Sequence, residues 1–205
     1  FGSSSIFAIK PLEWTEKLCE AMAGNTALVS LDLSDCALDD KCCDLLGAVL
    51  EADQKLEKLI LNKNAIRDGG CAKLATSLAR NITLREIELF GQTGGRKWGE
   101  GCLVTWLEMY KTNFSILRVN WTTNSKNTVT LTKMLARNMD VNNKIKNGDS
   151  GWHGSLPAEL RASPPAITFY QLEDAKAKRG GVPDAPYPSA HGCAWPGNKT
   201  CVGVY

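Results

Sequence analysis

One apolar pattern, repeated at a fixed distance, dominates the first part of this 205-residue chain. The pattern L-x-x-L-x-L-x-x-(C/N)-x-(L/I) occupies residues 28–38 and returns at residues 56–66, so that each of its positions is shifted by 28. Related apolar triplets begin at Leu84, after a further 28 residues, and at Ile116, after 32. A unit of this length cannot bury its apolar side alone, so successive units must stack and share a continuous core.

Each unit is predicted to contain a short strand followed by a helix. The segments between the strand patterns carry apolar residues at the spacing i, i+1, i+4, which marks one buried helix face. This face includes Leu18, Leu46, Leu74, Trp106 and Met134, and a narrower position beside it includes Gly47 and Ala75. On the strands, we expect Leu31, Leu59, Ile87 and Val119 to stack inside the core. The sequence therefore predicts a right-handed α/β solenoid, with a parallel sheet on the concave face and helices on the convex face.

The composition changes near Gly148. Residues 1–147 contain a single proline, Pro11, whereas residues 148–205 contain seven. Long helices and central strands do not tolerate such a proline content. We therefore divide the chain into an N-terminal capping segment and helix (1–24), the repeats with a C-terminal capping helix (25–147), and an irregular, extended tail rich in proline and glycine (148–205).

The unit length, and the Cys or Asn that follows the first two strands, identify the pattern as leucine-rich repeats. The helix ends Gly24-Asn25, Arg80-Asn81 and Thr112-Asn113, together with one unit longer by four residues, resemble the leucine-rich domain of tropomodulins and leiomodins. The resemblance covers residues 11–147, and repeats of the ribonuclease-inhibitor type share the same unit length. It implies the solenoid fold and, as a function, capping of the slow-growing end of actin filaments.

Histidine, the commonest general base and metal ligand, is scarce in this chain. The only histidines are His153 and His191, both in the proline-rich tail. Residues 148–151 (Gly-Asp-Ser-Gly) match a serine-protease motif, but that chemistry needs a histidine base and a buried carboxylate on a different fold. The eight cysteines include no Cys-x-x-Cys pair, and the six in the repeats are expected to be buried apolar groups. The sequence therefore predicts a protein that is not an enzyme, with no catalytic residues, no metal site and no cofactor.

The lengthened unit contains a glycine-rich loop at residues 91–99. It is not a phosphate-binding loop of the G-x-x-x-x-G-K-[ST] type, because Trp98 occupies the position of the required hydroxyl group. We interpret it as an enlarged loop between a strand and a helix. Its tip, Arg96, Lys97 and Trp98, is expected to be exposed and to contact a partner, since Arg and Trp are common at the centres of interfaces.

The tail is richer in aromatic residues than a disordered linker would be. Trp152, Phe169, Tyr170 and Trp195 lack the periodicity of the repeats, so we expect them to bind partner chains. Cys193 and Cys201 bracket Trp195 and leave two alternatives open: a disulfide that closes this segment into a loop, or two free thiols.

Charge and hydropathy narrow the range of partners. The 24 basic and 22 acidic residues are interspersed, unlike the basic stripe of a nucleic-acid-binding protein. No apolar run approaches the length of about 18 residues that a membrane-spanning helix needs. On the predicted concave face, a row formed by Ser30, Lys58, Glu86 and Arg118 mixes both charges with polar groups. This face either contacts protein or is simply solvated.

These features favour a non-enzymatic protein–protein interaction module, an accessory or scaffold subunit of a larger complex that binds other chains through its solenoid and its tail. The alternative, implied by the resemblance, is a tropomodulin-like cap on the pointed end of actin filaments, with actin as the partner. The first residues, Phe1-Gly2-Ser3, are compatible with removal of a plastid-targeting presequence. The expected compartment is therefore either an organelle, such as a plastid, or the cytoplasm.

Overall fold

A computed structural model describes residues 1–52, 55–93, 98–123 and 125–161 of the chain. Four short strands form one parallel sheet in the order β1-β2-β3-β4, which is also their order in the sequence. They are β1 (Ser30–Asp32), β2 (Lys58–Ile60), β3 (Glu86–Glu88) and β4 (Arg118–Asn120). Parallel neighbours need a crossover connection, and here a helix supplies each one.

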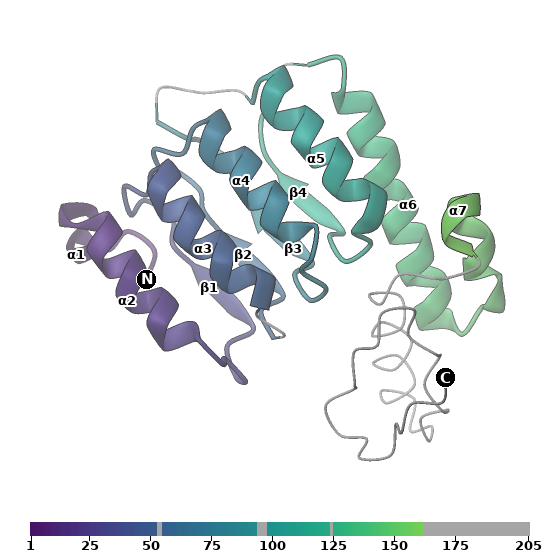
Figure 1. The fold of residues 1–205 in the computed structure, drawn as a ribbon, viewed down its shortest axis with the longest axis horizontal. Helices are drawn as coiled ribbons and strands as arrows, with labels where there is room; N and C mark the ends of the chain where they lie inside the picture. Colours follow the sequence, from purple (N-terminus) through teal and green to yellow (C-terminus); the bar gives the residue numbers. More distant parts are fainter. Residues whose placement is uncertain (53–54, 94–97, 124, 162–205) are drawn as a thin grey trace, which may run out of the picture.

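The longer helices lie side by side on one face of the sheet, as Figure 1 shows. The first helices in the chain are α1 (Ser5–Ile9) and α2 (Pro11–Met22), followed by α3 (Asp40–Ala52), α4 (Asp68–Leu78), α5 (Glu100–Thr112) and α6 (Thr128–Asn147). A 3₁₀ helix, η1 (Ser150–Ser155), and the short α7 (Ala158–Arg161) come last. The α/β solenoid predicted from the repeats is confirmed. Within the described ranges, none of the helices is long and apolar enough to cross a membrane.

The predicted stack of strand residues in the core is confirmed. Leu31, Leu59, Ile87 and Val119 pair with one another along the sheet in a single register. The first three are buried, and Val119, on the last strand, is partly buried against the same core. Burying one such side chain fully stabilises the fold by about 1.5–3 kcal/mol.

Close packing between α3 and α4 depends on Gly47. A Cβ atom at this position would lie 2.6 Å from Oγ of Ser77 on α4. Any side chain here would therefore displace Ser77 or push the two helices apart. Neighbouring helices therefore approach closely at the narrow helix position that Gly47 occupies.

Buried amide side chains tie each strand-to-helix turn to the turn of the unit before it. At the turn after β2, Oδ1 of Asn64 accepts hydrogen bonds from the backbone N–H groups of Cys36 (2.9 Å) and Leu38 (3.1 Å) in the preceding unit. Its Nδ2 donates to backbone carbonyl oxygens of both turns. Gln92 repeats this role one unit later, where its Oε1 accepts from the N–H of Ile66 at 3.2 Å. The backbone N–H and C=O groups of these turns, which have no partner in the sheet, thus form hydrogen bonds with buried amide side chains.

The turns that lead from each helix to the next strand are also held by buried amide side chains. Nδ2 of Asn113 donates to the carbonyl oxygen of Leu78 in the preceding unit at 2.7 Å. Its Oδ1 accepts from the N–H groups of Ser115 and Ile116 in its own turn. Both Asn81 and Asn113 are buried. The asparagines that mark the helix ends in the sequence are therefore structural.

Candidate functional site

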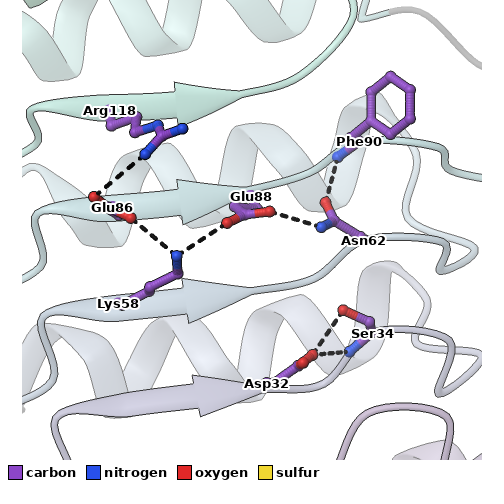
Figure 2. A network of polar contacts seen from close by, with 8 residues as sticks. All are labelled: Asp32, Ser34, Lys58, Asn62, Glu86, Glu88, Phe90 and Arg118. Carbon is purple, nitrogen blue, oxygen red and sulfur yellow. Dashed lines mark hydrogen bonds and ion pairs between the residues drawn. The ribbon is translucent and has the colours of Figure 1, made fainter.

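The concave face of the sheet carries a connected set of charged and polar side chains, drawn in Figure 2. Nζ of Lys58 on β2 lies 3.1 Å from Oε2 of Glu86 and 3.2 Å from Oε1 of Glu88, both on β3. Arg118 on β4 lies 3.8 Å from the other carboxylate oxygen of Glu86. The contacts follow from the parallel register, which places Lys58, Glu86 and Arg118 side by side. We call Lys58, Asn62, Glu86, Glu88 and Arg118 the concave network.

Asn62 links the charged part of the concave network to an aromatic residue. Its Nδ2 donates to Oε2 of Glu88 at 2.8 Å, and its Oδ1 accepts from the backbone N–H of Phe90 at 2.8 Å. Phe90 is 51% exposed, and Figure 2 shows its ring extending away from the network. The hydrogen bond fixes the backbone of Phe90, so a large apolar ring projects from a polar surface beside charges that are themselves paired.

In two members of the concave network, Glu88 and Lys58, the pKa is shifted in the direction that favours the charged form. The amide of Asn62 donates to Glu88 and lowers the pKa of that carboxyl group, and the ammonium group of Lys58 acts in the same direction. The carboxylate of Glu86 in turn raises the pKa of Lys58. A paired carboxylate with a lowered pKa is a poor general acid or base near pH 7. The network is therefore suited to recognising charged and hydrogen-bonding groups rather than to transferring protons.

The described cysteines belong to the interior of the solenoid. Cys43 and Cys71 are buried, and burial raises the pKa of both thiols. The indole N–H of Trp106 donates to the sulfur of Cys71 at 3.2 Å. These thiols act as small apolar groups of the core. In the part of the chain that the structure describes, no group of three or more His, Cys, Asp or Glu side chains is placed to hold a metal ion.

The structure corrects the prediction that Trp98 forms part of an exposed loop tip. Trp98 is 1% exposed, and its backbone N–H donates to the carbonyl oxygen of Thr122 at 3.0 Å. It lies 32 residues after Ile66, the same shift that separates Leu84 from Ile116, so it fills the last apolar position of the lengthened unit. Counting the unit in this way would have identified Trp98 as a core residue.

Trp152 is also placed differently from the prediction that it anchors a partner. It is 4% exposed and packs with Phe114, Val141, Ile145 and Leu156 in a second, smaller apolar cluster. Gly148, with φ 73°, ends α6 in the left-handed conformation and allows the chain to turn back over this helix. Val141 and Ile145 are four residues apart and lie on one face of α6. This spacing predicts that another segment covers the apolar face at the end of the array.

The remaining predicted site residues lie outside the described residues. They are Arg96, Lys97, Phe169, Tyr170, Cys193, Trp195 and Cys201. Partner contacts by the aromatic and basic residues, and the two alternatives for the cysteine pair, stay predictions.

Comparison with known proteins agrees with this architecture. A family model described as "Leucine Rich repeat" matches residues 24–45 and 52–75. The chain carries leucine-rich repeats. No curated protein matches it, but solved structures do.

Two solved structures resemble the chain over most of the solenoid. One is leiomodin-1 actin-binding site 2, with 23% sequence identity and a TM-score of 0.62 over 67% of this chain and 79% of that chain. The other is the tropomodulin C-terminal domain from Caenorhabditis elegans, with 21% identity and a TM-score of 0.60 over 67% of this chain and 82% of that chain. The resemblance to the leucine-rich domain of tropomodulins and leiomodins is thereby confirmed for the fold.

Proposed function

We propose that this chain is a protein-binding module, an accessory or scaffold subunit of a larger complex, and that its concave network together with Phe90 forms the main recognition surface. The observation that carries the proposal is the exposed side chain of Phe90, whose backbone N–H is bonded by Asn62 beside paired charges. Aromatic anchors surrounded by positioned polar groups dominate many protein interfaces. The same carboxylates are paired, which supports a binding role over a catalytic one.

Site-specific crosslinking tests this surface. A photoreactive phenylalanine analogue replaces Phe90 in one variant and Val104, an exposed residue on the convex helix α5, in a matched control. We expect a discrete crosslinked partner from position 90 and none from position 104. In addition, Phe90→Ser should weaken binding of that partner by about 2 kcal/mol, or roughly 30-fold in Kd. Equal crosslinking at both positions, or unchanged affinity of the Phe90→Ser variant, would show that the concave face is not the binding surface.

Actin binding is the second candidate function. It is favoured by the similarity in fold to a structure named as an actin-binding site of leiomodin-1. We expect this chain alone to inhibit elongation of actin filaments at their pointed ends only slightly. Strong inhibition at nanomolar concentration would reverse the order of the two candidates.

A further inference from the structure

The two ends of the solenoid expose apolar side chains, although terminal units of repeat arrays usually have polar outer faces. Leu28 is exposed even though it holds the same repeat position as Leu56, Leu84 and Ile116, which are fully buried. Of the ten large apolar side chains exposed among the described residues, eight lie in the first 29 residues or on α6. These eight are Phe1, Ile6, Ile9, Leu12, Leu28, Val29, Val129 and Met139. Figure 1 places α1 and α2 at one end of the row of helices and α6 near the other.

Met139 on α6 points to the place where a following helix would lie. It corresponds in the repeat to Glu51 on α3 and to Ala79, the residue that follows α4. Glu51 forms an ion pair with Arg80, beyond the end of α4, and Ala79 lines one shallow groove together with Met109 of α5. Both positions therefore face the next unit. Met139 faces the same way and is 49% exposed.

Within the described residues, no strand pairs with the outer edge of β1. β1 bonds to β2 through the carbonyl group of Val29 and the N–H of Leu33. In a parallel ladder, the N–H and C=O groups of Ser30 and Asp32 then point away from β2. Further along this edge, the carbonyl oxygen of Ser34 accepts a hydrogen bond from the N–H of Ser3 at 2.7 Å.

At the other end of the sheet, none of the described strands pairs with the outer edge of β4. β4 bonds to β3 through the N–H of Arg118 and the carbonyl group of Asn120. The N–H and C=O groups of Val119 therefore point away from the sheet. Within the sheet, Leu31 pairs with Leu59, and Lys58 and Ile60 flank Leu59 on β2. Val119 therefore offers its N–H and C=O groups as Leu31 offers its own to β2. The outer edge of β1 offers the partners that these groups need, namely the carbonyl oxygen of Ser30 and the N–H of Asp32.

The two ends also carry opposite net charge. Residues 1–35 contain five acidic side chains and two lysines, whereas residues 113–147 contain six basic side chains and one aspartate. The exposed members include Glu16 and Glu20 on α2, and Lys133 and Lys146 on α6. Opposite charge attracts the two ends, while two copies joined through the same end would bring like charges together.

We propose that this chain associates with a second copy of itself head to tail. The N-terminal end surface (α1, α2, Leu28 to Asp32) of one copy docks on the C-terminal end surface (β4 and the Met139 side of α6) of the next. Such a contact joins two different surfaces, so it leaves a free end on each side and allows growth beyond a dimer. Because α1 and residues 1–3 occupy part of the first surface, the contact is small, and small interfaces are weak.

Light scattering on the full chain at increasing concentration tests the association. We expect the weight-average mass to rise continuously above that of the 22.3 kDa monomer, and to fall back when ionic strength increases from about 0.05 to about 0.5 M, since salt screens exposed charges. A chain that stays monomeric up to about 0.5 mM at low salt, where even weak contacts with Kd near 1 mM become visible, would overturn the proposal. So would growth that stops at a dimer.

Three substitutions identify the surfaces. Val29→Lys alters the N-terminal end, Met139→Asp the C-terminal end, and Val104→Asp the middle of the convex face; the native side chains are 46%, 49% and 46% exposed. We expect the first two variants to be monomeric on their own and the third to associate like the wild type. An equimolar mixture of the first two retains one intact end of each kind, so it should form dimers and nothing larger. A mixture that stays monomeric, or a Val104→Asp variant that loses association, would contradict the head-to-tail arrangement. Melting curves of all three variants verify that each one is folded.

Discussion

A substitution of Asn64 measures directly how much the hydrogen bonds between successive repeats stabilise the fold. The side chain of Asn64 is fully buried, and its Oδ1 accepts hydrogen bonds from the N–H groups of Cys36 and Leu38. In the first repeat the equivalent position holds Cys36, whose sulfur contacts the carbonyl oxygen of Ser34. Asn64→Cys therefore introduces a residue that the same position already accommodates, while it removes the amide.

The expected loss of stability follows from the groups left behind. Two buried N–H groups lose their acceptor, and each unsatisfied buried donor costs about 1–3 kcal/mol. A thiol is a weak acceptor and recovers little of this. We expect Asn64→Cys to lower the free energy of unfolding by about 2–5 kcal/mol, a large part of the stability of a domain.

Denaturant unfolding followed by circular dichroism measures this difference, provided that the slope of the unfolding free energy against denaturant is unchanged. Asn143→Ala is the matched control, because Asn143 is exposed on α6 and surface substitutions usually stay within about 0.5 kcal/mol. A loss below about 1 kcal/mol for Asn64→Cys would refute the reasoning, since it would mean that the two amides find other partners.

Three further predictions concern the core, the helix spacing and pH. Leu59→Ala should cost about 2–5 kcal/mol in denaturant unfolding, because Leu59 is fully buried at the centre of the strand stack; a cost under about 1 kcal/mol would argue against a tightly packed core. Gly47→Val should cost about 1–3 kcal/mol by overpacking, and adding Ser77→Ala should restore part of it, because Oγ of Ser77 is the nearest atom; no recovery would place the strain elsewhere. The pKa of Glu88 is lowered in the folded protein, so its ionised form stabilises the fold above the unfolded pKa of about 4.3 and this contribution is lost as pH falls through the folded pKa. Unfolding experiments between about pH 6 and pH 3 should therefore show a smaller loss of stability for Glu88→Gln than for the wild type, and identical pH profiles would contradict this assignment.

The repeat positions explain why the solenoid is predictable from the sequence and why the burial of Trp98 is harder to predict. Leu59 and Ile87 occur at a fixed shift, so their common place in the core follows from sequence alone. Trp98 follows the same rule only after the four-residue lengthening of its unit is counted, and its loop composition suggested exposure instead.

Trp152 obeys no repeat at all. Its burial depends on the uncovered face of α6 near Val141 and Ile145 and on the turn at Gly148, which is a matter of tertiary packing rather than of local pattern. The concave network was visible in the sequence only as a row of mixed residues. That Glu88 binds both Lys58 and Asn62 depends on side-chain directions across the strands, which the register allows but does not determine.

The buried amides make each turn depend on a unit that is synthesised later. Asn64 accepts from N–H groups of the unit before it, and Gln92 does so for Ile66, so each turn is completed by residues that are synthesised later. During synthesis, the turn around Cys36 stays open to water until Asn64 has left the ribosome and its own unit has folded. Hydrogen exchange at the Cys36 amide therefore reports the folding of the second repeat rather than the first, and loss of the unit that contains Asn64 leaves the N–H groups of Cys36 and Leu38 without their acceptor.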